Sequence, residues 1–243
     1  MDIYVWLCGC RERELDYTTK CSCYPCQTPD QCRRRIRSNQ EEVFIKLLLV
    51  GKTKSLPAII HCRDTGDGAV AARALELITQ LGCRDMRFHR HCFNGDLLEL
   101  QQWKTLPNIV FGVTWKSVRE NPDVIPRINL DQLVLETDSP YLSLYSCCPI
   151  NHPWNLPAVA LEVASLRNVP LSVLNWTTNE NTEILRHAEG ISVLWSGALG
   201  VVQMTTSSCK YSVNTFAVVI PGRCFHCDQQ MTLVMYISFP YSG

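Results

Sequence analysis

Three polar residues, His61, His91 and Asp138, each stand at the end of a short apolar run. Imidazole nitrogens and carboxylate oxygens bind borderline and hard divalent cations at about 2 Å. A bound divalent ion makes a water molecule more acidic and neutralises charge that develops on phosphoryl oxygens. A single histidine after a strand is more often structural, and an aspartate there often caps a turn. Three such residues at the same position on three runs favour a metal site.

The elements that position these residues are short apolar runs alternating with longer amphipathic segments from Pro57 onward. Strands are predicted over 58–61, 86–91, 108–114 and 133–135, and helices over 70–81, 96–103, 151–167 and 171–186. This alternation is typical of an α/β protein with a parallel sheet, because crossover helices return the chain in the same direction. In an α/β barrel the carboxyl ends of such strands converge on one site.

Three stretches of the sequence resemble signature blocks of TatD-related deoxyribonucleases. They are Leu56–Arg63 (LPAIIHCR), His89–Gly95 (HRHCFNG) and Leu135–Tyr141 (LETDSPY). The HRHCF form and the segment Asp16–Cys21 look closest to large vertebrate members of the family. The resemblance implies a (β/α) TIM-type barrel of the metal-dependent hydrolase kind, incomplete at its N-terminus. It also implies one or two divalent ions, Mg²⁺, Mn²⁺ or Zn²⁺, and DNA as a substrate whose phosphodiester bonds are cleaved.

The resemblance further implies which residues form the site. The family's bridging glutamate sits in a Gly-Glu-x-Gly-Leu-Asp block, which Arg11–Asp16 (RERELD) matches with Glu12 kept and both glycines replaced. The implied metal ligands are Glu12, His61, His91 and Asp138, with Glu12 and Asp138 as catalytic residues and Asp138 as proton acceptor for the attacking water. Arg63, directly after His61, is a candidate for binding a substrate phosphate, with a surface salt bridge as the alternative.

One departure from the family pattern bears on activity. The family opens with a strand ending in His-x-His, whereas the six histidines here are His61, His89, His91, His152, His187 and His226. His89 and His91 have that spacing but belong to a later predicted strand. If the family pattern holds, one metal keeps Glu12, His61 and His91, and the other only Glu12 and Asp138. The alternative to an active nuclease is therefore a catalytically impaired fragment or isoform that acts as a binding protein.

Two side-chain clusters lie in a segment of about 21–39 that is rich in Cys, Pro and Arg and is predicted to be a loop or insertion. Cys21, Cys23, Cys26 and Cys32 have spacings that a tetrahedral zinc site can use, which would make a zinc-binding interaction module. A second pair, Cys224 and Cys227, is a weaker signal, and Cys62 and Cys92 are expected to be small buried residues. The basic cluster Arg33–Arg37 fits a DNA backbone contact, a nuclear address or a solvated surface.

Composition bounds the remaining possibilities. The 243 residues carry 23 basic and 23 acidic side chains, so no overall charge attracts the chain to nucleic acid or anionic lipid. We expect residues 1–187 to form the hydrolase domain and residues 188–243 a tail whose pattern assigns it no fold. Fourteen cysteines spread along the chain, together with a start that lacks a secretory signal, favour reduced thiols and a nuclear or cytoplasmic location. No apolar run reaches membrane-spanning length, and oligomeric state is left open.

Overall fold

The computed structural model describes the chain in segments. Residues 14–20, 27–63, 65–144 and 150–182 are described in full, and the backbone alone is described for residues 12–13, 191–196, 201–206, 213–223 and 230–240. The chain divides into two compact units. The first unit comprises residues 1–136 and 158–185, and the second comprises residues 137–157 and 186–243.

The first unit is built on a five-stranded parallel sheet. Its strands are β1 (Glu12–Asp16), β2 (Ala58–Arg63), β3 (Phe88–Arg90), β4 (Ile109–Val113) and β5 (Leu133–Leu135). They pair in sequence order, β1-β2-β3-β4-β5, and every pair is parallel. Sequential parallel pairing is the arrangement of consecutive strands in a (β/α) barrel, and it brings all five carboxyl ends to one edge of the sheet.

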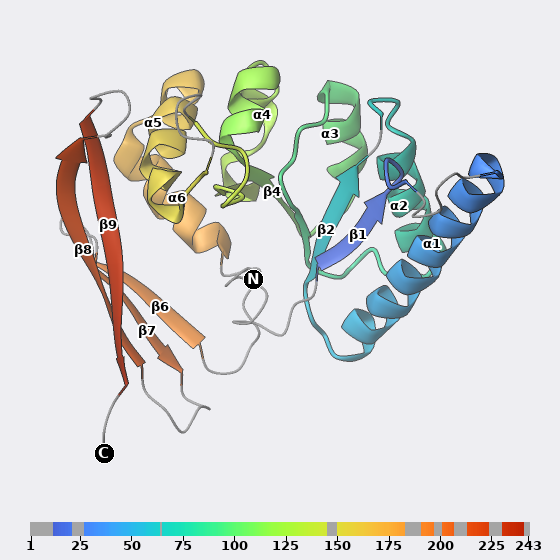
Figure 1. Cartoon of the computed structure of the whole chain (residues 1–243), viewed down its shortest axis with the longest axis horizontal. Helices are drawn as coiled ribbons and strands as arrows, with labels where there is room; N and C mark the ends of the chain where they lie inside the picture. The colour runs from blue at the N-terminus through green and yellow to red at the C-terminus, as the bar shows by residue number, and fades with distance from the viewer. Residues whose placement is uncertain are drawn as a thin grey trace. The chain divides into compact units, whose positions relative to one another are not determined.

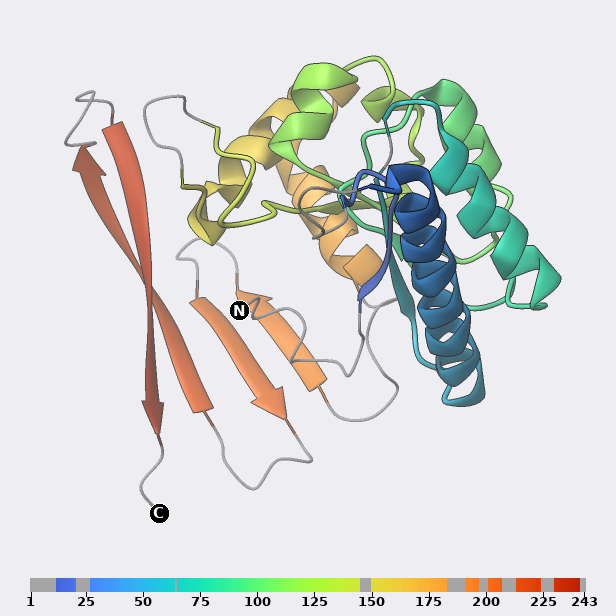
Figure 2. The same ribbon diagram turned by 45° about the vertical axis from the view of Figure 1, so that its right-hand side comes forward.

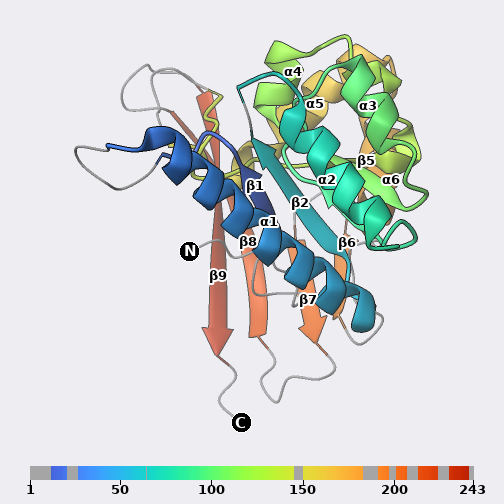
Figure 3. The same cartoon turned by 90° about the vertical axis from the view of Figure 1, so that its right-hand side faces the viewer.

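Helices connect these strands and cover the sheet (Figure 1). They are α1 (Pro29–Thr53), α2 (Ala69–Gln80), α3 (Leu97–Trp103), α4 (Trp115–Glu120), α5 (Leu156–Arg167) and α6 (Leu171–Thr182), with short 3₁₀ turns at Ile125–Arg127, Leu130–Gln132 and Pro153–Asn155. The longest helix, α1, contacts β1 and runs across β1 and β2 in the view of Figure 3. Proline at the start of α1 suits a first helical turn, where its missing N–H has no intrahelical partner to lose.

The hydrophobic core lies between the sheet and these helices. All five residues of β4 are buried, as expected for a strand of a parallel sheet that is covered on both faces. Phe88 from β3 and Phe111 from β4 are fully buried, as are Leu48 from α1 and Trp103 from α3. Burying one such side chain stabilises the folded state by about 1.5–3 kcal/mol relative to leaving it exposed to water.

The four strands and the helices that the sequence predicts from residue 58 onward are present, with small shifts at their ends. The helix predicted over 70–81 is α2, and the strand predicted over 58–61 continues to Arg63 as β2. The helix predicted over 151–167 begins at Leu156, after the 3₁₀ turn at Pro153–Asn155. The helix predicted over 171–186 is described as far as Thr182.

Two helices were missed by the sequence patterns. Helix α1 begins at Pro29, so the prediction of a loop over 21–39 is wrong from that residue onward, and Arg33–Arg37 are helical. Ile36, Phe44 and Leu48 provide the apolar side of α1, but the arginines and cysteines around Ile36 obscure the spacing. Helix α4 has six residues, too few for a periodicity, and it is defined by a capping box between Thr114 and Ser117.

The second unit contains four strands in the region for which the sequence assigns no fold. Strands β6 (Ile191–Ser196) and β7 (Val201–Thr206) pair antiparallel, and so do β8 (Val213–Arg223) and β9 (Gln230–Pro240). The long β8–β9 pair is seen in Figure 2. Among the described residues of the whole chain, no helix combines the length and apolar character that crossing a membrane requires.

Candidate metal centre

The candidate site is built at the carboxyl ends of β2, β3 and β5. His61 lies near the end of β2, His89 lies within β3 and His91 directly follows it, and Glu136 directly follows β5. Parallel pairing brings these strand ends to the same edge, as predicted for His61 and His91. The ring centroids of His61 and His91 are 5.7 Å apart, so the structure does bring these two predicted ligands together.

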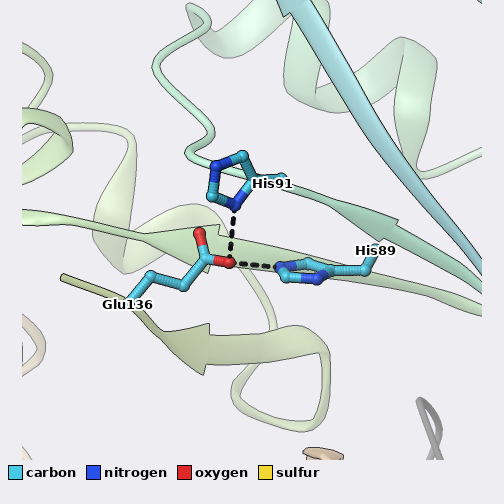
Figure 4. Close-up of side chains that lie close together, drawn as sticks. All are labelled: His89, His91 and Glu136. Carbon is cyan, nitrogen blue, oxygen red and sulfur yellow. Dashed lines mark hydrogen bonds and ion pairs between the residues drawn. The ribbon is translucent and has the colours of Figure 1, made fainter. Parts of the chain in front are cut away.

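A buried carboxylate joins two of the histidines (Figure 4). His91 Nδ1 lies 2.9 Å from Glu136 Oε1, and His89 Nε2 lies 2.8 Å from the same oxygen. The other carboxylate oxygen, Oε2, accepts a hydrogen bond of 2.8 Å from the backbone N–H of Cys92. The side chains of His89 and Glu136 are only 8% and 13% exposed, so water does not compete strongly for these contacts.

Electrostatics keep this carboxylate ionised. Burial raises the pKa of Glu136, but the neighbouring imidazoles of His89 and His91, through electrostatic attraction and hydrogen bonding, together outweigh the effect of burial. The pKa therefore lies well below its ordinary value. An ionised carboxylate only accepts hydrogen bonds, which matches its three nitrogen neighbours.

The donor set fits a divalent cation. One ligand atom from each of His89, His91 and Glu136 lies within 4.8 Å of the other two, and the ring of His61 is next to that of His91. Imidazole nitrogen with carboxylate oxygen is a combination that zinc, manganese and iron accept. The residues present at this edge therefore suit the ion that the family resemblance implies.

The structure does not bring the other two predicted ligands, Glu12 and Asp138, to the histidines within the described side chains of the first unit. The backbone of Glu12 opens β1 opposite Ile59 of β2, while its side chain lies outside the described residues. Asp138 lies in the segment 137–157 that groups with the second unit. Its φ angle is +55°, and its carbonyl accepts a hydrogen bond of 2.8 Å from the N–H of Tyr141.

The sequence patterns did not identify His89 and Glu136 as residues of the site around His91. Both carry a weak local signal, because His89 precedes His91 by two residues and Glu136 precedes Asp138 by two. Two-residue spacing puts side chains on the same face of an extended segment. Nothing in the sequence, however, indicates that Glu136 would reach the histidines from two strands away.

Arg63, the predicted phosphate-binding residue, ends β2 with its side chain 58% exposed. Its Nη1 lies 3.4 Å from Oδ2 of Asp16, whose side chain is only 11% exposed, so a long salt bridge joins an exposed guanidinium to a largely buried carboxylate. The predicted alternative of a salt bridge is thus present, and phosphate binding by Arg63 stays a prediction.

The predicted thiol clusters lie mostly outside the described residues. These do not include Cys21, Cys23 and Cys26 of the first cluster, or Cys224 and Cys227 of the second pair. Cys32 lies in α1, half-buried, beside the hydroxyl of Thr28. Cys62 and Cys92, which flank the histidines, are partly buried, and Cys62 packs against the hydrophobic core.

The chain is similar to several known proteins. The family described as TatD related DNase matches residues 24–187. The human "3'-5' RNA nuclease TATDN2" is 29% identical over 183 residues, which cover 72% of this chain and 22% of that protein. The Escherichia coli "Uncharacterized metal-dependent hydrolase YcfH" is 30% identical over 162 residues, 62% of this chain and 56% of that one. The chain thus spans about half of one relative and less than a quarter of the other.

Solved structures share the fold. The crystal structure of a hydrolase TatD family protein from Entamoeba histolytica aligns with a TM-score of 0.56 at 21% identity, over 71% of this chain and 60% of that one. This likeness identifies the five-stranded parallel sheet with its helices as an α/β fold of the TIM-barrel type. Because the family match extends over residues 24–187 and thus over most of the chain, the protein belongs to the TatD-related DNase family.

Proposed function

We propose that the protein is a metal-dependent hydrolase that cleaves phosphodiester bonds in nucleic acid, with DNA as the expected substrate. The observation that carries the proposal is the meeting of His61 and His91 beside the largely buried carboxylate of Glu136 at the carboxyl edge of the sheet. The family is described as a DNase and a relative is named an RNA nuclease, which supports nucleic acid as the substrate class.

Each residue has a role under this proposal. His61 and His91 would hold a divalent ion, and Glu12 and Asp138 are the further ligands that the resemblance implies. Such an ion would make a water molecule more acidic and offset charge on the phosphoryl oxygens. Asp138 would serve as the proton acceptor, and the exposed guanidinium of Arg63 would bind a non-bridging phosphate oxygen by charge-assisted hydrogen bonds.

The exposed arginines of α1 supply a second contact for the substrate. Arg37 stacks over the ring of Tyr17, 4.4 Å from its centroid, and Tyr17 directly follows β1. The N-terminal half of α1 therefore lies at the same edge of the sheet as the histidines. Arg33 and Arg34 line a surface pocket with Arg37 and Asp30, and the polynucleotide backbone is proposed to pass along this basic surface.

The test is a cleavage assay on labelled single-stranded DNA and RNA with Mg²⁺ or Mn²⁺, with a chelator, and with metal content measured on the same preparation. We expect cleavage that the chelator abolishes and that His91→Asn lowers at least about 100-fold. His152→Asn is the matched control, because His152 stacks on Trp154 in the second unit, and it should cleave like the wild type. A folded, metal-loaded protein that cuts neither polymer would overturn the proposal and favour a non-catalytic binding protein.

A further inference from the structure

We infer that Glu136 and His89 are positioning residues that fix the ring and the tautomer of His91, so that Nε2 is the atom His91 presents to a metal ion. The inference rests on the proposed function in one respect only, namely that His91 is a ligand. The arrangement of protons that it assigns is a property of the protein without metal. In this assignment His89 and Glu136, although their ligand atoms lie within 4.8 Å of one from His91, hold the ring of His91 and do not bind the ion themselves.

The assignment starts from the backbone. The N–H of Cys92 can only donate, so Glu136 Oε2, 2.8 Å away, is an acceptor. Oε1 of the same carboxylate then faces His91 Nδ1 at 2.9 Å, and a carboxylate oxygen needs a donor at that distance. The proton of a neutral His91 ring therefore sits on Nδ1, and its lone pair sits on Nε2.

His89 stabilises this carboxylate from a second direction. Its Nε2 lies 2.8 Å from Oε1, and its ring is nearly perpendicular to that of His91, with an interplanar angle of 89°. Figure 4 shows the two rings approaching the same oxygen from different sides. Both ring nitrogens of His89 are buried and neither makes a well-directed hydrogen bond among the described residues, so the close ion-pair contact of Nε2 with Glu136 is what accounts for the placement of this ring.

Three contacts on two oxygens leave the carboxylate little freedom to rotate. Oε2 is held by the backbone that follows β3, and Oε1 is held by two imidazoles. In addition, the carboxylate packs against Gly112 of β4, which has no side chain to displace it. A ligand histidine whose second nitrogen donates to a fixed carboxylate is both oriented and made more basic, and losing such a partner typically weakens metal binding about 10–100-fold.

The first experiment reads the tautomer directly. Protein labelled with ¹⁵N at histidine is freed of metal with a chelator, and long-range ¹H–¹⁵N spectra identify the protonated nitrogen of each ring. We expect His91 to carry its proton on Nδ1 in the wild type. In Glu136→Gln the amide oxygen should keep the hydrogen bond from the Cys92 N–H, which turns the NH₂ toward His91 Nδ1, so the Nδ1–H form should lose its dominance. A wild-type His91 protonated on Nε2 would overturn the inference, whatever the protein does to nucleic acid.

The second experiment adds Zn²⁺ and reads the bound nitrogen and the affinity by calorimetry. We expect Zn²⁺ to shift Nε2 of His91 and leave Nδ1–H in place. Glu136→Gln and His89→Leu should weaken binding about 10–100-fold, and His89→Gln, which keeps a donor, should recover most of that loss. A shift at Nδ1 would make Glu136 a competing ligand and refute the inference, as would unchanged affinity in Glu136→Gln and His89→Leu. Circular dichroism and thermal unfolding verify that each variant is folded.

Discussion

Gly112 and the Glu136 carboxylate lie so close together that any side chain at residue 112 would overlap the carboxylate. A Cβ added at Gly112 would lie 1.9 Å from Glu136 Oε2 and 2.2 Å from the carboxyl carbon. The glycine sits in β4, between the strand that carries His89 and the strand that precedes Glu136. The carboxylate therefore reaches the histidines across β4 only because this strand has no side chain at residue 112.

Gly112→Ala should accordingly displace the Glu136 carboxylate and weaken metal binding. Overpacking of this kind costs roughly 1–3 kcal/mol in the free energy of unfolding, measured by urea denaturation. Zinc affinity, measured by calorimetry, should fall about 10–100-fold. The matched control is Ile109→Val in the same strand, which should cost about 0.5–1.5 kcal/mol and keep zinc affinity. Equal zinc affinity in both variants would show that the position of the carboxylate does not matter.

Asp138→Ala should remove metal-dependent cleavage without unfolding the chain. The proposed role of Asp138 is to bind metal and accept a proton, and neither role contributes to the core of the first unit. Cleavage of labelled single-stranded DNA and the thermal unfolding midpoint are measured on the same sample. Asp85→Ala, which removes an exposed carboxylate in the turn before β3, is the control and should retain full activity. Equal cleavage by wild type and Asp138→Ala would refute the assigned role.

The basic surface of α1 predicts a change in the salt dependence of nucleic-acid binding. Each phosphate contact to a single strand contributes about 0.7 to the slope of log K against log salt. Replacing Arg33, Arg34 and Arg37 with glutamine should therefore lower that slope by about 2 in fluorescence anisotropy with labelled oligo-dT. The outcome that contradicts this is an unchanged slope in the folded triple variant.

A second triple variant provides the control for that measurement. Lys54 follows the C-terminus of α1, Arg84 follows α2, and Arg87 precedes β3, so all three lie at the opposite edge of the sheet. Replacing them with glutamine removes the same net charge. A slope that changes equally in both triple variants would indicate a general charge effect and would refute a specific contact at α1.

The contact of Tyr17 and Arg73 with Glu41 predicts how stability depends on pH. Arg73 Nη2 lies 2.7 Å from Glu41 Oε2, and the Tyr17 hydroxyl donates to Oε1 at 2.8 Å. Hydrogen bonding from Arg73, opposed by partial burial, lowers the pKa of Glu41 below its ordinary value. Burial first, and then the neighbouring Glu41, raise the pKa of Tyr17 to about 12.

The signs of the two effects follow by linkage. Below the ordinary glutamate pKa the unfolded chain binds a proton that folded Glu41 does not, so stability present at neutral pH is lost as pH falls toward the lowered pKa. Above about 10 the unfolded Tyr17 ionises first, so stability is lost as pH rises toward 12. Urea unfolding at several pH values should show a shallower acid loss in Glu41→Gln than in Glu162→Gln, an exposed control. Identical acid slopes would contradict this account.

The sequence by itself determined the local elements and the positions of two candidate ligands. Apolar runs such as Ala58–Ile60 and the spacing of Val70, Ala74 and Leu77 depend only on neighbouring residues, so β2 and α2 are readable without the fold. Parallel strands place their carboxyl ends together, and for this reason the meeting of His61 and His91 was also predictable.

Only the tertiary structure decided which further side chains surround those histidines. Glu136 reaches His89 and His91 across β4 because Gly112 leaves space, and that depends on strand order, side-chain direction and a missing Cβ together. Likewise, α1 is helical through its arginines because Phe44 and Leu48 dock on the sheet, against a local composition that favours a loop. Local patterns encode what each segment can form, whereas contacts between distant segments are set by packing that no single stretch of sequence contains.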